Sequence, residues 1–463
     1  MLTPPGASST TAVQPVTSRS APSLRSWLRD GAGVLAVKIG GVVAAAAAHL
    51  FLARWLGTEA CGVYVSVYAL LCMAVLLGKF GFEPATQRFV GTYRAAENRA
   101  ELAGFFGFRA RQLWWMNLAL LAAGGIALAL LSNWLAPMTW WCAWVALAIL
   151  PLAVLNDIQS ADLRAIGAAQ RAEWISMLLR PALLILLAGS AMASGSPRKA
   201  LTAMAALLIA YLVSAALQWV SLRQNTTSVT PVAPTASETK LWREAGLLFT
   251  WIAVCQAVML QSETLLLGVL SGPEPAAIFA AALRLAQMAS LGILAVTATN
   301  APAIAGLFAQ EKLAELQQAA TRMAIAATLF TLPVVFVLAL FGRSILGWFG
   351  ADFSQGYVAL VILLAGQTIN ALCGAGAALL GMTGRHRELA LAQTAAAVVK
   401  LVLLVVVIPV WGLIGAALVS VGCTAICNAL MVWFVARRLS INSAALVPVS
   451  LFGSRSACPR TIA

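Results

Sequence analysis

Four charged side chains stand inside long apolar stretches of this sequence: Lys38, Glu263, Arg284 and Lys400. If these stretches cross a bilayer, each charge at mid-helix costs about 2.5–3.5 kcal/mol, so it must face another charge or a water-filled cavity. Three positive charges and one negative charge leave a net charge of +2. In a low-dielectric cavity that charge would attract a pyrophosphate group and repel an amphipathic cation.

Each of these charged residues has a polar residue three, seven or eleven positions away. These spacings match whole turns of a helix, so the two side chains of each pair share a helix face. The pairs are Lys38 with His49, Gln256 with Glu263, Arg284 with Gln287, and Gln393 with Lys400. We therefore expect a cavity lined by Lys38, His49, Gln256, Glu263, Arg284, Gln287 and Lys400.

A different interpretation stays open for several of these residues. Lys38 can extend its amine to the nearer membrane surface, and His49 can be a packing residue. Glu263 and Arg284 can form a structural ion pair between consecutive helices. Lys400 is the hardest to explain in this way, because it lies near the middle of its apolar stretch.

The elements that must position these residues are membrane-spanning helices. Hydrophobic residues make up 61% of the chain and charged residues only 10%, with a mean hydropathy of +0.89. A hydrocarbon core of roughly 30 Å takes about 20 helical residues to cross. The 463 residues hold about twelve such crossings, with no room for a large soluble domain.

The predicted spans fall into two sets of six, which we expect to form two six-helix bundles. The first bundle covers residues 31–220, with spans at 32–53, 60–80, 110–131, 139–159, 174–193 and 200–220. The second covers 246–436, with spans at 246–270, 276–299, 323–341, 357–380, 389–408 and 412–435. A polar linker (221–245) separates them, a basic disordered tail (1–30, not a signal peptide) precedes them, and a tail (437–463) follows.

Lys and Arg are distributed unevenly between the two sides of these spans. With the N-terminus in the cytoplasm, the outer loops hold only Arg54, Arg198, Lys199 and Arg343 of the 30 basic residues. Three more lie inside the membrane, and 23 fall on the inner side, counting Lys79 and Arg180, which lie close enough to that surface to extend their charges to it. Basic residues concentrate on the cytoplasmic side of membrane proteins. The sequence therefore predicts that both termini are cytoplasmic.

The turn after the first span of each half carries an internal similarity. Gly57 aligns with Gly272, 215 residues later, and Glu59 with Glu274. Two halves of like topology suggest duplication, a common origin of transporters.

Other classes of ligand fit the composition poorly. The net charge of +14 is scattered among the loops and not gathered on one face, so nucleic acid is not expected. The eight cysteines lie mostly in apolar runs and only two histidines exist, so neither a metal site nor another cofactor is expected.

Several segments resemble the bacterial polysaccharide flippases (O-antigen and exopolysaccharide) of the multidrug, oligosaccharidyl-lipid and polysaccharide exporter superfamily. FLARWLGTEACGVY (51–64) resembles the family's first outer turn, and GKFGFEPATQRFV (78–90) its exit from the second span. GMTGRHREL (381–389) and IPVWGLIGAALVS (408–420) resemble its C-terminal motifs. The resemblance covers about residues 31–438.

This resemblance implies an all-α membrane protein with two bundles in a V around a central cationic cavity. It implies movement of undecaprenyl-diphosphate-linked oligosaccharide across the bacterial inner membrane, with membrane lipid, a polysaccharide polymerase and glycosyltransferases as pathway partners. By position, Lys38, Arg88 and Arg284 fit the cationic lining. The family often has Asn where this chain has Lys400.

Two rival functions remain. A multidrug extrusion antiporter would need membrane-embedded carboxylates, for which Asp157 and Glu263 are the candidates. A membrane-embedded polysaccharide polymerase or ligase would need a large outer loop with catalytic groups. The longest expected outer loop, 342–356, has Arg343 and Asp352 as its only charges, so an enzyme is not expected.

Overall fold

The computed structural model describes residues 24–95, 98–195, 197, 199–225, 236–374, 376–439 and 441, and these residues form helices and their connections without a strand. The expected tails and linker lie mostly outside this range. Where they are described they are helical: α1 begins at Leu24, α7 runs to Asn225 and α8 begins at Ala236. The ordered helices therefore extend beyond the apolar spans at these three places.

The first half of the chain contains seven α-helices and one π-helix. They are α1 (Leu24–Gly78), α2 (Phe82–Ala95), α3 (Arg99–Leu130), α4 (Pro137–Ala165), α5 (Ala169–Glu173), the π-helix η1 (Trp174–Leu179), α6 (Arg180–Ala193) and α7 (Ala200–Asn225). The second half contains α8 (Ala236–Leu270), α9 (Pro273–Met288), α10 (Leu291–Ala309), α11 (Leu313–Gly347), the 3-10 helix η2 (Ala351–Gly356), α12 (Tyr357–Cys373), α13 (Gly376–Met382) and α14 (His386–Leu439).

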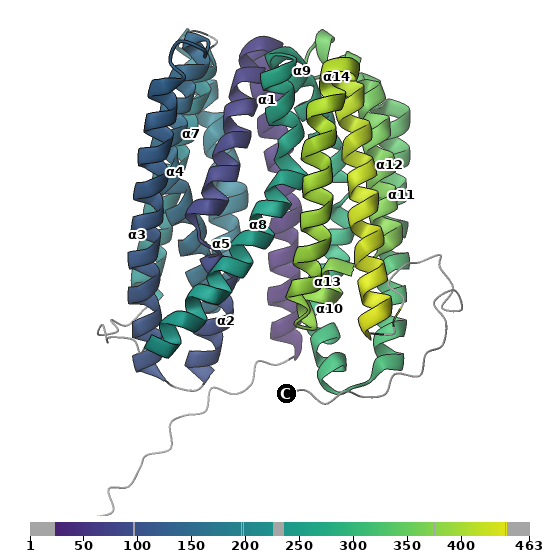
Figure 1. Ribbon diagram of the computed structural model, residues 1–463. Helices are drawn as coiled ribbons and strands as arrows, with labels where there is room; N and C mark the ends of the chain where they lie inside the picture. The colour runs from purple at the N-terminus through teal and green to yellow at the C-terminus, as the bar shows by residue number, and fades with distance from the viewer. Residues whose placement is uncertain are drawn as a thin grey trace, which may run out of the picture.

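The two longest helices each double back at a glycine. At 1.5 Å per residue, the 55 residues of α1 and the 54 of α14 would extend about 80 Å, far more than a bilayer core. Gly57 (φ 78°, ψ 178°) and Gly412 (φ 51°, ψ −129°) break them, in backbone conformations that only glycine adopts readily. Each helix therefore provides two consecutive spans, seen as paired ribbons in Figure 1.

The number of spans agrees with the sequence prediction. Within the described residues, nine helices are long and apolar enough to cross a membrane, and α9 with α10, bent by 43°, makes a tenth. Counting α1 and α14 as two spans each brings the total to the expected twelve. The chain is an all-α membrane protein.

The internal similarity in the sequence corresponds to a shared turn. Gly272 has φ 95° and ψ 173°, close to the values at Gly57. Both glycines lie just before the second span of their half, so the two halves enter that span through the same backbone conformation.

The two halves lie side by side, with α3, α4 and α7 on one flank and α11, α12 and α14 on the other (Figure 1). We call the end at which α1 and α8 begin the lower end, as drawn. At the upper end α1 and α9 almost touch: a Cβ atom on Gly62 would lie 1.8 Å from the carbonyl oxygen of Pro273. At the lower end a Cβ atom on Gly81 would lie 2.4 Å from the carbonyl oxygen of Gly246.

Helix α8 packs against helices of both halves. It crosses the molecule obliquely, from beside α2 at the lower end to α9 and α14 higher up (Figure 1). Near its start, Trp242 is fully buried, and its indole nitrogen donates a 2.9 Å hydrogen bond to the hydroxyl of Tyr93 on α2. The rings of Phe105 and Phe108 on α3 lie 5.5 and 5.6 Å from the Trp242 ring. The first turns of α8 are thus anchored in the other half.

Candidate functional site

A cavity of about 110 Å³ lies between the two halves. Its walls come from α1, α6 and α7 of the first half and from α8 and α9 of the second. The polar side chains in its lining are His49, Tyr64, Tyr68, Arg180, Tyr211, Gln261, Thr264, Arg284 and Gln287. No Asp or Glu is among the lining residues.

Two arginines give this cavity its charge. The Arg284 guanidinium donates a 3.4 Å hydrogen bond to the side-chain oxygen of Gln287, one turn further along α9. The Arg180 guanidinium lies 4.7 Å from the centre of the Tyr211 ring, a cation–π contact across α6 and α7. In the described part of the chain neither arginine forms an ion pair, so their positive charges are not neutralised by a carboxylate.

Aromatic side chains with polar atoms surround these charges. Three of the five tyrosines in the chain, Tyr64, Tyr68 and Tyr211, line the cavity. The rings of Tyr64 and Tyr68 stack with centroids 6.0 Å apart. The Nε2 atom of His49 is buried without a hydrogen-bond partner. The lining therefore offers two cations, the three phenolic hydroxyl groups and the faces of the rings.

Three of the eight residues expected in a cavity line this one: His49, Arg284 and Gln287. Arg180 was assigned by sequence to the inner membrane surface, yet it also lines the cavity. Its position inside the predicted span 174–193 is the signal that would have placed it with the buried charges.

Glu263 and Lys400 pair with each other and not with the cavity. Lys400 on α14 forms an ion pair with Glu263 on α8, and the exposed fractions of the two side chains are 0% and 1%. The alternative pairing of Glu263 with Arg284 is therefore wrong. Helical spacing shows which residues share a face, but it does not show which neighbouring helix that face meets.

Gln256 and Arg88 also lie away from the cavity, and both are exposed. The helical path turns at Phe80 and Gly81, which have φ values of 47° and 62°, before α2 begins. Arg88 follows this turn on α2, so it lies at the lower end, with its guanidinium 5.6 Å from the Phe89 ring.

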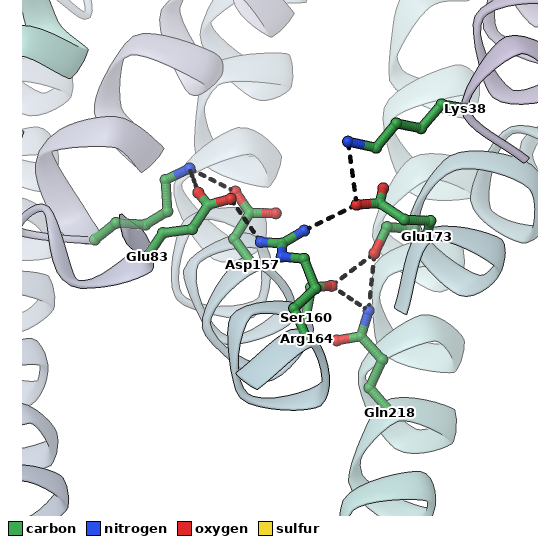
Figure 2. Close-up of polar contacts among 9 residues, drawn as sticks. Lys38, Glu83, Asp157, Ser160, Arg164, Glu173 and Gln218 are labelled. Carbon is green, nitrogen blue, oxygen red and sulfur yellow. Dashed lines mark hydrogen bonds and ion pairs between the residues drawn. The ribbon is translucent and has the colours of Figure 1, made fainter. Parts of the chain in front are cut away.

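Lys38 enters an ion cluster in the lower part of the first half. Its amine lies 3.7 Å from Glu173, whose carboxylate also contacts Arg164 at 3.3 Å (Figure 2). Arg164 contacts Glu83 at 2.7 Å. Lys38 therefore neither reaches for the membrane surface nor lines the cavity described above.

The ion cluster continues through Lys79, which lies 2.8 Å from Glu83 and 2.9 Å from Asp157. The cluster thus holds three positive and three negative side chains: Lys38, Lys79, Arg164, Glu83, Asp157 and Glu173. Its members come from α1, α2, α4, α5 and, in the case of Lys79, the turn between α1 and α2, so the cluster joins four helices of the first half without net charge.

A neutral polar group borders the ion cluster. The hydroxyls of Ser160 and Ser176 are 2.7 Å apart, and the Gln218 amide donates to them at 2.9 and 3.0 Å (Figure 2). Ser176 lies on the π-helix η1, which widens the helix between α5 and α6. The sequence pattern did not predict this polar group.

Comparisons with known proteins agree on family and fold. Residues 28–308 match the family model described as "Polysaccharide biosynthesis protein". Among curated proteins, no sequence relative matches this chain.

Several solved transporters share the fold. One, described as the inward-facing conformation of a multidrug resistance MATE family transporter of the MOP superfamily, superposes with a TM-score of 0.68 at 17% identity, covering 88% of this chain and 94% of that one. An outward-facing MATE structure gives a TM-score of 0.65 at 16% identity, with 89% and 96% covered. A MOP superfamily transporter from Pyrococcus furiosus, described as having a binding pocket of reverse polarity that suggests a different function, gives 0.64 at 16% identity, also with 89% and 96% covered.

Proposed function

The chain belongs to the polysaccharide biosynthesis protein family, and from this premise we propose that it is a flippase for lipid-linked oligosaccharide joined through a diphosphate. The observation that carries the proposal is the charge of the central cavity: among the described residues, its two arginines have no carboxylate partner and its lining contains no acidic side chain. The fold and the family belong to membrane transport, and an enzymatic activity is not proposed.

Arg180 and Arg284 would hold the diphosphate. Guanidinium groups bind phosphate oxygens through charge-assisted hydrogen bonds. At an effective dielectric constant near 20, one close charge pair is worth roughly 4 kcal/mol, which offsets part of the desolvation of the phosphates. The cavity charge proposed here is that of Arg180 and Arg284 and not the sum over Lys38, Glu263, Arg284 and Lys400 that the sequence predicted, since Lys400 and Lys38 have carboxylate partners.

The neutral lining would contact the sugar next to the diphosphate. The hydroxyls of Tyr64, Tyr68 and Tyr211 can donate to and accept from sugar hydroxyls, and their rings offer flat apolar faces. A volume of about 110 Å³ suits a head group and not a whole oligosaccharide. Transport would therefore require the two halves to separate at one end and then at the other, by alternating access.

The multidrug antiporter remains the second candidate on the strength of the fold, but no charge in the cavity supports it. Its two candidate carboxylates are engaged elsewhere: Asp157 with Lys79 and Glu263 with Lys400. A cationic drug in the cavity would meet two positive charges and no negative one. The polymerase or ligase alternative finds no carboxylate in the cavity either.

The proposed setting is the bacterial inner membrane, with both termini and the lower end in the cytoplasm. The exposed basic residues Arg88, Arg94, Lys240 and Arg437 lie near the lower end, in keeping with that orientation. The substrate would come from glycosyltransferases on the cytoplasmic side, and a polysaccharide polymerase would use the product on the outer side.

Complementation of a strain lacking the gene tests the proposal. The wild-type chain should restore surface polysaccharide without changing resistance to ethidium-like cations. Arg284→Gln and Arg180→Gln should insert at normal levels and restore little polysaccharide, whereas Arg284→Lys should restore much of it because the charge is kept. Drug efflux on overexpression, with polysaccharide intact in the deletion strain, would contradict the proposal and favour the antiporter.

A further inference from the structure

The second half of the molecule contains two separate hydrophobic cores. One core is shared with the first half and includes residues of α9, α12 and the upper parts of α11 and α14. The other lies in α10, α13, residues 313–327 of α11, and residues 386–396 and 427–439 of α14. We call these elements the lower section, since α10 and α13 lie in the lower part of the molecule (Figure 1). In the described part of the first half, a single core runs from Ala200 near the upper end to Tyr93 near the lower end.

Three spans are interrupted or weakened at the level where the two cores meet. Helices α9 and α12 both run down from the upper end and stop there, after 16 and 17 residues. Helix α10 continues from α9 with a bend of 43°, and Gly374, with φ 73° and ψ −157°, separates α12 from α13. Helix α11 is continuous, but Pro333 inside it has no N–H to donate to the carbonyl oxygen of Leu329.

Direct contacts place the proline of α11 beside the bend between α9 and α10. The hydroxyl of Thr331 donates a 3.1 Å hydrogen bond to the carbonyl oxygen of Ala289, which lies between the two helices. A Cβ atom on Gly292 would lie 2.7 Å from the Cβ atom of Phe330. Sharp bends in helices occur mostly at proline, at glycine and at interruptions of the backbone hydrogen bonds. The second half can therefore bend at this level in three of its spans together.

Polar side chains occupy the layer between the two cores. The amide of Asn428 donates a 3.1 Å hydrogen bond to the side-chain oxygen of Asn370, and Lys400 pairs with Glu263. Within the described residues, the Oε1 atom of Gln393 and the Oε2 atom of Glu263 are buried without a hydrogen-bond partner. Close packing of apolar side chains holds two bodies together, whereas an unpaired polar atom gains nothing from burial. This layer therefore resists separation less than a continuous core would.

We propose that the lower section is a hinged body that bends at Ser290, Pro333 and Gly374 and so opens the lower end of the molecule. The part of the second half above the hinge stays packed on the first half, and the close contact of α1 with α9 at the upper end is kept. Helix α8 also stays in place, because Trp242 anchors its first turns in the first half. A few residues at the ends of helices are sufficient to absorb such a motion.

The hinge adjoins the central cavity. Gln287 lines the cavity one turn above the bend, and the hydroxyl of Ser290 donates a 2.6 Å hydrogen bond to its carbonyl oxygen. The side chain of Gln287 in turn accepts a hydrogen bond from Arg284. A diphosphate held by Arg284 would therefore act on the turn of α9 that ends at the hinge. This link to the substrate rests on the proposed flippase function, whereas the hinge itself does not.

A native cysteine lies at the contact that the hinge motion would break. The indole nitrogen of Trp251 on α8 donates a 2.8 Å hydrogen bond to the hydroxyl of Thr394 in the lower section. The Sγ atom of Cys255 lies 3.5 Å from the same hydroxyl, and its side chain packs against Ala397. Movement of the lower section away from α8 would uncover Cys255. A rotation of the whole second half, α8 included, would keep α8 and α14 together and leave Cys255 buried.

Labelling of the native cysteines with N-ethylmaleimide tests the hinge in the full-length protein in lipid nanodiscs. Peptide mass spectrometry gives the rate at each cysteine, and division by the rate for the same cysteine in the unfolded chain removes differences in intrinsic reactivity. In wild type, Cys255 should be less protected than Cys142, which is fully buried in α4. Pro333→Ala supplies the missing N–H and stiffens α11, so it should slow labelling of Cys255 about two- to tenfold. Pro151→Ala, the matched control inside α4, should leave that rate unchanged.

Two outcomes would overturn the hinge. If Cys255 in wild type is as protected as Cys142, the lower section does not separate from α8, and this result needs no variant. If Pro151→Ala slows Cys255 as much as Pro333→Ala does, bending of α11 is not the motion that uncovers it. Farnesyl diphosphate should change the Cys255 rate in wild type and not in Arg284→Gln. A reactive Cys255 that does not respond to farnesyl diphosphate would support the hinge and overturn its link to the proposed substrate.

Discussion

Neutralising the two cavity arginines should weaken the binding of a lipid diphosphate, and the energies of the lost contacts set the size of the effect. Hydrogen bonds to charged groups contribute about 1.5–3 kcal/mol, and a close charge pair at an effective dielectric constant near 20 about 4 kcal/mol. At about 1.4 kcal/mol per factor of ten, Arg284→Gln or Arg180→Gln should raise the Kd by roughly tenfold to a thousandfold. The double variant should lose measurable binding, because no other Lys or Arg lines the cavity in the part of the chain that the structure describes.

The assay is titration of farnesyl diphosphate into purified protein in nanodiscs, with uncharged farnesol as the comparison ligand. Arg223→Gln is the matched control, since Arg223 is exposed at the end of α7, over the ring of Trp219 at 4.8 Å. Farnesol binding should be the same in every variant. If both cavity variants bind the diphosphate as tightly as wild type, or if Arg223→Gln loses as much, the assignment of the cavity to a diphosphate is wrong.

Three further predictions concern packing and orientation. Gly62→Val should force α1 and α9 apart, because its Cβ atom would lie 1.8 Å from the Pro273 carbonyl oxygen, and buried Cys61 should then react with a maleimide. Trp242→Ala should lower the free energy of unfolding by about 3–5 kcal/mol, measured by thermal melting. Trp242→Phe should cost less, because it keeps an aromatic ring: about 0.5–1.5 kcal/mol for the lost hydrogen bond to Tyr93, in addition to the smaller buried ring area. Reporter fusions after Ser354 should report the outer side, and fusions after Thr235 the cytoplasm.

Each of these has an outcome that counts against it. Gly91→Val is the control for Gly62, since a Cβ atom at Gly91 meets nothing within 4 Å, and equal Cys61 labelling in both variants would refute the close contact. Equal melting of the Ala and Phe variants at Trp242 would show that its aromatic surroundings contribute nothing. An outer-side signal at Thr235 would invert the topology.

The spans were predictable from sequence because a run of about 20 apolar residues is a local property. The turn at Gly57 was predictable for a similar reason, since its repeat at Gly272 is visible in the sequence. The partners of the buried charges were not. That Glu263 meets Lys400 and not Arg284 depends on how α8 packs between α9 and α14, and the spacing of residues along one helix carries no information about that packing.

The cavity itself was predicted in part. Arg284, Gln287 and His49 were named, but Arg180 was missed because a charge near the start of a span is easily assigned to the membrane surface. Arg88 was placed in the cavity by resemblance alone. The turn at Phe80 and Gly81, with positive φ at both residues, carries it away to α2.

The shared turn at Gly57 and Gly272 also bears on how the two halves differ in the groups that they present to the cavity. A chain made of two equivalent halves would present the same chemistry to a ligand from both sides, and the ligand could bind in two opposite orientations. The residue at the same distance from Gly57 as Arg284 is from Gly272 is Ala69. The two halves thus share the backbone turn, but at this position only the second half carries a charge. The two cavity arginines lie on helices that do not correspond in the two halves, Arg180 on α6 and Arg284 on α9, so the proposed anionic head group would meet a different arrangement of groups on each side.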